Sequence, residues 1–123
     1  MKIQDQEVLI ELNGEQYHCA MDVTLSFISG KWKTVVLWYL RNEKKRFTEI
    51  RQLIPQMTER MLSITLKQLE DDGIVLREVY NTKPPLKVEY SLTPFGKTLI
   101  PVLNAIAKWG RNLAETEGKL VVL

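Results

Sequence analysis

The stretch Thr58–Asp72, TERMLSITLKQLEDD, decides the fold of this chain. Its less polar residues recur at the i, i+4, i+7 spacing that gathers side chains into one stripe on a helix. That stripe consists of Met61, Leu62, Thr65, Leu66 and Leu69. Thr58 can cap the start by accepting a hydrogen bond from an early backbone N–H, and Gly73 supplies the left-handed residue that ends it. The stretch therefore predicts an amphipathic helix over residues 58–72.

The opposite face of this helix combines a fork-shaped donor, a hydroxyl, an amide and an apolar contact. These are the groups that read base edges in a DNA major groove. They belong to Arg60, Ser63, Ile64, Lys67 and Gln68. A surface helix with scattered polar residues explains this face equally well, so the neighbouring segments must decide between the two interpretations.

A second amphipathic segment comes directly before this helix. Residues 46–54, RFTEIRQLI, place Phe47, Ile50 and Leu53 or Ile54 on one face, and Pro55 stops the segment. Two short helices joined by so tight a turn form a helix-turn-helix pattern. Further helices are expected over residues 21–29 and 33–40, and the second is apolar almost all round, which is typical of a buried helix.

After Gly73 the periodicity changes from helical to alternating. Leu86, Val88, Tyr90 and Leu92 point one way, which predicts a half-buried strand, and residues 74–80 are its expected partner. A hairpin directly after a recognition helix is a wing, here over residues 74–92. Its candidate contacts to phosphate or the minor groove are Arg77, Lys83 and Lys87. An edge hairpin that merely covers the core is the alternative.

The two ends of the chain have patterns of their own. Alternation around Asn13-Gly14, a favoured two-residue turn, predicts a short hairpin within an N-terminal arm of residues 1–17. Thr93-Pro94 starts a helix expected to reach residue 117, with a kink or break at Pro101. Its apolar stripe needs a partner surface, either this chain's own core or a second copy, and consists of Leu99, Leu103, Ile106, Trp109 and Leu113.

The bulk composition is that of one folded domain. The chain has 123 residues, of which 45% are hydrophobic and 26% charged. No apolar run approaches the length of a membrane span, and MKIQDQE does not read as a signal peptide. A single cysteine rules out an internal disulfide framework and indicates a reducing cytoplasm. The net charge of +2 is only a weak bias toward anionic partners.

Several motifs in series resemble the HxlR family of winged helix-turn-helix regulators, relatives of the MarR-like group. The matching stretches are Cys19 leading into the first helix, GKWK (30–33), RFTEI (46–50), TERMLSITLKQLEDDGIV (58–75), PP…VEYSLTPFG (84–96) and IAKWG (106–110). The resemblance implies a mainly α fold with a small β wing, and a homodimer formed through terminal helices such as 93–117. It also implies that helix 58–72 enters the major groove of an inverted-repeat site while the wing approaches the minor groove.

These patterns together favour a sequence-specific, DNA-binding transcriptional regulator. An enzyme is disfavoured, because one histidine and one cysteine offer little acid–base machinery and no phosphate-binding glycine loop or metal-ligand cluster is present. We therefore expect no catalytic residue, metal or cofactor. A winged helix that binds protein instead of DNA is the remaining alternative, but it should have lost its groove-facing basic residues. Those that are present are Arg60, Lys67, Arg77, Lys83 and Lys87, along with Arg46, Arg51 and Lys31.

Cys19 has two interpretations. It is either a small apolar residue that fills space beside the first helix, or a reactive thiol, since unpaired N–H groups at a helix start stabilise a thiolate. The resemblance is consistent with the second interpretation, because some family members sense oxidants or electrophiles at this position, but it leaves both interpretations open. The family usually has proline after the cysteine, where this chain has Ala20. With no second cysteine, any disulfide must join two subunits or link to a small thiol.

Overall fold

Helix α4 (Glu59–Asp71) forms where the sequence predicts it, in a computed structural model that describes residues 2–119 and 121–123. Thr58 Oγ1 accepts a hydrogen bond of 3.1 Å from the Met61 N–H. At the other end Gly73 has φ +76°, and the N–H groups of Gly73 and Ile74 donate to the carbonyls of Glu70 and Leu69 at 3.0 and 2.9 Å. This pair of bonds is a Schellman motif, and it satisfies carbonyls that a helix end otherwise leaves unpaired.

The buried stripe of α4 is narrower than the sequence predicts. Leu62, Thr65, Leu66 and Leu69 are buried, but Met61 is 40% exposed, so its expected place on the stripe is wrong. Met61 is one residue, about 100° of helical rotation, away from Leu62. It therefore lies at the edge of the stripe.

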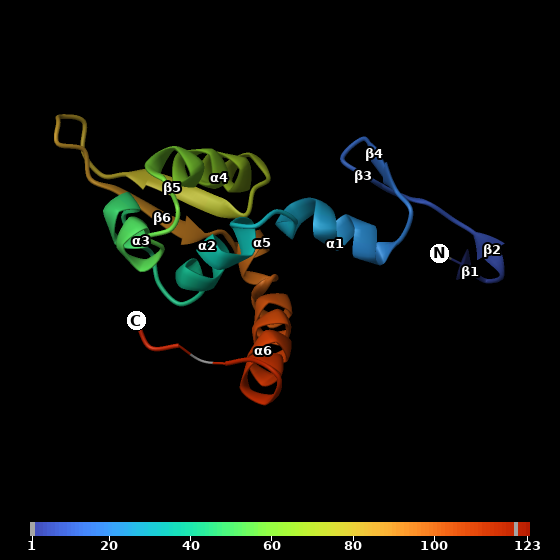
Figure 1. Cartoon of the computed structure of the whole chain (residues 1–123). Helices are drawn as coiled ribbons and strands as arrows, with labels where there is room; N and C mark the ends of the chain where they lie inside the picture. The colour runs from blue at the N-terminus through green and yellow to red at the C-terminus, as the bar shows by residue number, and fades with distance from the viewer. Residues whose placement is uncertain (1, 120) are drawn as a thin grey trace.

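The three helices before α4 are short, and α1 extends from the body toward the N-terminal arm (Figure 1). They are α1 (Ala20–Ile28), α2 (Lys33–Leu40) and α3 (Phe47–Leu53). Helix α2 has the predicted bounds, whereas α1 begins and ends one residue earlier than predicted. Helix α3 begins after Arg46, whose N–H donates to Glu49 Oε1 at 2.9 Å. This bond closes the first turn of α3 and fixes its start.

The wing is an antiparallel hairpin of β5 (Val75–Val79) and β6 (Val88–Leu92), with Val75 opposite Leu92 and Val79 opposite Val88. Lys45 adds a bridge to the other edge of β6, where its N–H and carbonyl exchange bonds of 2.9 and 2.8 Å with Tyr90. Leu86 is 48% exposed and lies outside the strand. Residues 88–91 are all half-buried and only Leu92 is buried, so the strand forms as predicted but the predicted alternation of buried and exposed side chains does not.

The N-terminal segment consists of two small hairpins that stand away from the body in Figure 1. Strands β3 (Ile10–Leu12) and β4 (Glu15–Tyr17) are joined by Asn13-Gly14, both with positive φ, as the sequence predicts. The hairpin of β1 (Lys2–Ile3) and β2 (Gln6–Glu7) is not foreseen, because its turn, Gln4-Asp5, lacks a residue that favours positive φ strongly. Met1, which the predicted arm includes, lies outside the described residues.

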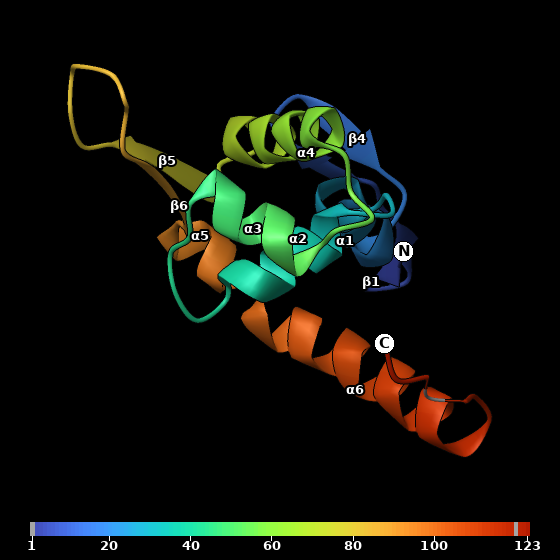
Figure 2. The ribbon, with the colours of Figure 1, turned by 60° about the vertical axis from the view of Figure 1, so that its left-hand side comes forward.

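The C-terminal helix is broken, as Pro101 predicts. Helix α5 (Pro94–Lys97) is capped by Thr93 Oγ1, which accepts from the Gly96 N–H at 2.9 Å. Helix α6 (Ile100–Thr116) then starts with Pro101 in its first turn, where a missing N–H costs nothing. Figure 2 shows α6 leaving the body as a projecting rod.

One core joins α2, α3, α4, the wing and the start of α6. The buried apolar residues nearest its centre include Val36, Leu37, Ile50, Leu62, Leu69 and Ile74. Phe27 of α1 meets Phe95 of α5 edge to face, with ring centroids 5.5 Å apart. No helix within the described residues is both long and apolar enough to cross a membrane.

The junction between the wing and α5 depends on the absence of a side chain at Gly96. The Ile74 carbonyl oxygen accepts from the Thr93 N–H at 3.0 Å and lies so close to Gly96 that a Cβ there would clash with it. We expect Gly96→Ala to lower the free energy of unfolding by about 1–3 kcal/mol, the usual cost of overpacking. Thermal or urea unfolding measures this loss.

Gly110→Ala is the matched control, because a Cβ at Gly110 meets no atom within 4 Å. Within a helix this exchange should raise stability by about 0.5–1 kcal/mol. Equal losses in the two variants would contradict the account of Gly96.

Candidate nucleic-acid interface

The outer face of α4 presents the residues predicted to read base edges. Arg60, Ser63, Ile64 and Lys67 are all exposed, and Ile64 keeps 41% of its surface accessible. Their side chains share one face because they are spaced three, four and seven residues apart. The buried stripe on the other side prevents α4 from turning about its axis, so this face is held outward.

Lys67 is partly engaged within the protein. Its Nζ lies 3.0 Å from Asp71 Oδ1, one helical turn away, and both side chains are largely exposed. The hydrogen bond that Lys67 donates to Asp71, followed by the charges of Asp71 and Glu70, raises the pKa of Lys67. An exposed ion pair of this kind exchanges readily with solvent. Lys67 thus stays charged and can move to a phosphate or base.

The acidic residues at the end of α4 have partners that offset their unfavourable position on the helix dipole. Asp71 pairs with Lys67, and Asp72 Oδ2 lies 3.9 Å from Lys33 Nζ on α2. The contact between Asp72 and Lys33 links the C-terminal end of α4 to α2.

The tip of the wing is organised by one exposed side chain, Asn81. Its Oδ1 accepts from the Lys87 N–H at 2.7 Å, and its Nδ2 donates to the carbonyls of Pro85 and Lys83 at 2.9 and 3.2 Å. These bonds close the loop between β5 and β6. Lys83, a predicted wing contact, is therefore presented on an ordered loop.

The tip end of the wing, where the strands meet the loop, carries a basic cluster that the sequence did not reveal. The ammonium groups of Lys44 and Lys87 lie 5.4 and 5.2 Å from the centre of the Tyr80 ring, and Lys44 Nζ donates to Tyr80 Oη at 3.1 Å. That hydrogen bond is the main cause of the raised pKa of Lys44. Lys44 is far from Tyr80 in sequence, so only the folded chain brings them together.

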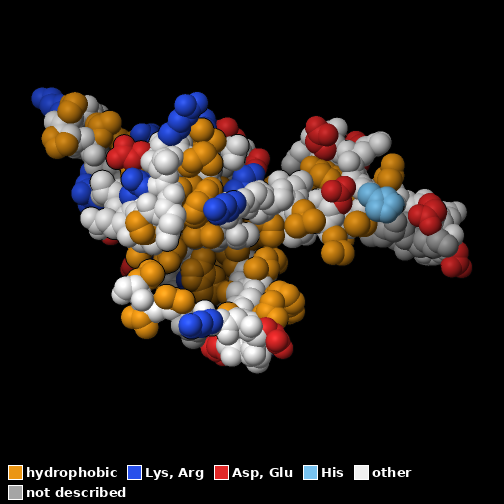
Figure 3. Space-filling model, in the orientation of Figure 1, with side chains coloured by type: hydrophobic (Ala, Val, Ile, Leu, Met, Phe, Trp, Pro, Cys, Tyr) orange, Lys and Arg blue, Asp and Glu red, His pale blue; other side chains and the backbone are white. Residues whose placement is uncertain are grey.

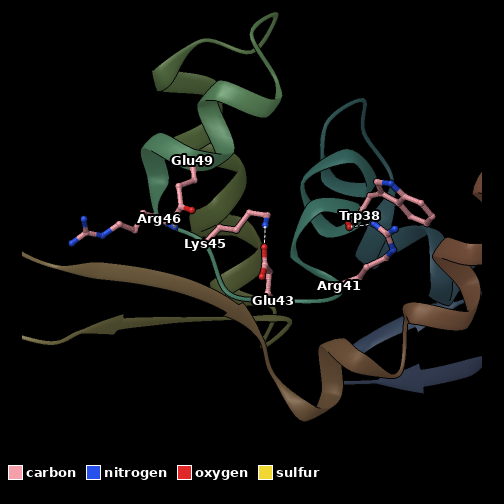
Figure 4. A network of polar contacts seen from close by, with 6 residues as sticks. All are labelled: Trp38, Arg41, Glu43, Lys45, Arg46 and Glu49. Carbon is pink, nitrogen blue, oxygen red and sulfur yellow. Dashed lines mark hydrogen bonds and ion pairs between the residues drawn. The ribbon is translucent and has the colours of Figure 1, made fainter.

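Two arginines line the surface between the wing and the helix-turn-helix. Arg77 of β5 borders one hollow with Ser63 and Lys67 of α4, and a second with Arg46 at the start of α3. In Figure 4 the Arg46 side chain extends outward from α3. Arg77, a predicted DNA contact, therefore lies beside the outer face of α4. Arg46, which the sequence identified as a retained basic residue without a specific contact, joins it.

Charge is divided unevenly along the molecule. Residues 1–29 hold one Lys or Arg and five Asp or Glu, whereas residues 30–123 hold 16 and 10. Figure 3 shows basic side chains above α4 and at the wing tip, with acidic ones gathered on the N-terminal arm. The small net charge of +2 therefore hides a basic body and an acidic arm.

Cys19 is half-buried and forms the N-cap of α1, with no hydrogen bond from its side chain to the helix. The neighbouring His18 N–H donates to Asp22 Oδ2 at 3.1 Å, which closes the first turn of α1. Within the described residues no three His, Cys, Asp or Glu side chains gather as a metal site would require.

The predicted interface stripe divides into two parts. Leu103 is buried in the protomer's own core, so its predicted contact with a second chain is wrong. Leu99 is half-buried against that core, and its predicted contact with a second chain stays a prediction. Ile106, Trp109 and Leu113 remain 47%, 70% and 44% exposed on the outer part of α6. The difference arises because α6 packs on the body only with its first two turns.

The family model described as HxlR-like helix-turn-helix matches residues 27–118 of this chain. The chain belongs to the HxlR family. This HxlR protein is 49% identical over 102 residues to the uncharacterised HTH-type transcriptional regulator YdeP of Bacillus subtilis (strain 168), covering 83% of this chain and 79% of YdeP. These findings confirm the predicted family and the winged helix-turn-helix fold.

Solved structures give the same result for this HxlR protein. The redox regulator HypR in its reduced form matches with a TM-score of 0.74 and 46% identity, covering 77% of this chain and 93% of HypR. The reduced form of the transcriptional regulator YodB from B. subtilis matches with a TM-score of 0.67 and 32% identity, covering 83% and 98%. The HxlR protein is thus a transcriptional regulator of the helix-turn-helix class, and its relatives are regulators rather than enzymes.

Proposed function

We propose that this protein binds double-stranded DNA sequence-specifically as a homodimer, with α4 in the major groove and the wing at the minor groove. The observation that carries the proposal is the outer face of α4. There the guanidinium of Arg60, the hydroxyl of Ser63 and the apolar side chain of Ile64 are exposed, with basic side chains on both sides. The proposal places Arg60, Ser63, Ile64 and Lys67 at base edges, and Arg77, Lys83 and Lys87 at phosphate or the minor groove.

Two further observations support this assignment over a protein-interaction module. Arg46, Lys44 and Lys87 extend the basic surface from α3 to the wing, whereas the acidic arm lies away from it. Such a surface suits DNA, because basic side chains neutralise the phosphates and these contacts supply much of the affinity. A regulator of this kind works where the genome lies, so the proposal also places the protein in the cytoplasm.

Base reading and phosphate binding should be separable by mutation. A duplex selected by the wild-type protein from a randomised pool provides the probe. If Arg60 makes a bidentate contact to guanine, Arg60→Ala should cost about 1–3 kcal/mol and relax the preference at one base pair. Lys83→Ala should weaken binding to selected and unrelated duplexes alike and reduce the salt slope by about one counterion. Unchanged affinity and selectivity in Arg60→Ala would refute the assignment.

The homodimer is proposed to form through the outer part of α6 together with α1 and the arm. Trp109 on α6, and Met21 and Leu25 on α1, are exposed apolar side chains on segments that stand away from the body. An open apolar hollow between α2 and α6, lined by Trp38 and Ile106, continues this surface. A two-fold dimer would place its recognition helices about 34 Å apart, which matches an inverted-repeat site.

Sedimentation at micromolar concentration should show a dimer for the wild-type protein. Trp109→Asp should shift it toward monomer without unfolding the protomer, because Trp109 is 70% exposed. Leu86→Asp, on the exposed wing tip, is the control and should stay dimeric. A wild-type monomer that binds a single half-site tightly would contradict the arrangement.

We also propose that an oxidant acts on this regulator through Cys19. HypR, a redox regulator, is similar to this chain, and Cys19 lies at a helix start on the segment assigned to the dimer. Oxidation by diamide would remove two electrons and two protons from a pair of thiols, joining Cys19 to its copy in the partner or to added glutathione.

The test compares wild type with Cys19→Ser, treated with diamide in the presence and absence of glutathione. Wild type should form a crosslinked dimer or a glutathione adduct, with a change in affinity for the selected duplex, while Cys19→Ser should not respond. If the two proteins respond alike, or neither is modified, Cys19 serves only for packing.

A further inference from the structure

Arg51 on α3 carries a buried donor that the fold does not use. Its Nη1 is buried, and no hydrogen-bond partner for it lies among the described residues. A buried donor without an acceptor costs free energy, so each such group in a native protein needs an explanation, and a role in binding is one.

The surroundings of Arg51 indicate what that role is. A hollow at the junction of α3 and α4 is lined by Phe47, Thr48, Arg51, Gln52, Pro55 and Glu59. Glu59 is the first residue of α4, so the hollow lies at the N-terminal end of α4, where α4 follows α3. Thr48 and Gln52 are exposed and offer a hydroxyl and an amide as further donors. Glu59, also exposed, is the lining group of opposite charge.

We infer that Arg51 anchors a phosphate of the DNA backbone in this hollow, which fixes the angle of α3 as α4 enters the groove. This inference rests on the DNA binding proposed above. A phosphodiester has the oxygen acceptors that a guanidinium binds strongly, and the first helix of a helix-turn-helix crosses the backbone. Because Nη1 ends a flexible side chain that already lines the hollow, a rotation of the guanidinium presents it to the phosphate.

A phosphate-anchoring role and a packing role predict opposite effects on stability. If Arg51 serves DNA, then Arg51→Met keeps the aliphatic stem against its neighbours and removes an unpaired buried donor. The free protein should keep its melting temperature or raise it, while DNA binding weakens. If Arg51 holds the fold together, the same substitution should lower the melting temperature.

The experiment measures the affinity of wild type, Arg51→Met and Arg51→Lys for the selected duplex and an unrelated duplex between 50 and 200 mM salt. Arg51→Met should bind both duplexes more weakly by a similar factor. Its slope of log affinity against log salt should be shallower by about 0.9 for each Arg51 that contacts DNA. Arg51→Lys should keep the slope, because it keeps the charge. Lys97→Met, the control, removes an exposed charge from α5 and should leave the slope unchanged.

A methylphosphonate scan of the selected duplex identifies the phosphate directly. Neutralising the phosphate bound by Arg51 should weaken wild type but have little effect on Arg51→Met. If Arg51→Met keeps the wild-type slope, or if no position shows this coupling, the inference is overturned. A lowered melting temperature in both Arg51 variants would also overturn it. If the wild-type protein binds neither duplex, the proposed function itself is overturned. If wild type and Arg51→Met bind the duplexes with equal affinity, only the role of Arg51 is overturned.

Discussion

The burial of one stripe of α4 is the constraint on which the rest of this structure depends. Leu62, Leu66 and Leu69 are almost fully removed from water against α2, α3 and the wing. Each such side chain stabilises the fold by about 1.5–3 kcal/mol relative to an exposed one. Turning α4 by one residue would expose the stripe, so the direction of its outer face is determined by the core. The specificity of the proposed DNA reading thus depends on hydrophobic packing.

The features that the sequence predicts well are those set by local chemistry. The caps of α4 at Thr58 and Gly73, the turn at Asn13-Gly14 and the break before Pro101 each follow from what a few adjacent residues can do. The outer face of α4 follows in the same way, since a helical period and one buried stripe define the exposed side. Most of the proposed base-reading surface could therefore be identified before the fold was known.

The features that the sequence does not predict depend on contacts between distant segments. Tyr80 and Lys44 meet only because Lys45 joins the edge of β6. Leu103 belongs to the same apolar stripe as Trp109, but the body covers only the first turns of α6, so one is buried and the other is 70% exposed. Periodicity identifies an apolar face and cannot state what covers it. The buried donor of Arg51 is likewise visible only in three dimensions.

The junction at Ile74 has a consequence for how such a protein can diversify. The Ile74 carbonyl accepts from the Thr93 N–H, and Thr93 Oγ1 donates to the Gly73 carbonyl at 2.6 Å, so both ends of the wing hairpin are joined directly below α4. Residues 80–87, beyond that closure, are all exposed. Substitutions, insertions or deletions at the tip therefore leave the core and the angle of α4 intact. If the wing and α4 both contact DNA as proposed, the wing can acquire new nucleotide preferences independently of the helix, and the two elements can evolve as separate modules on one fixed frame.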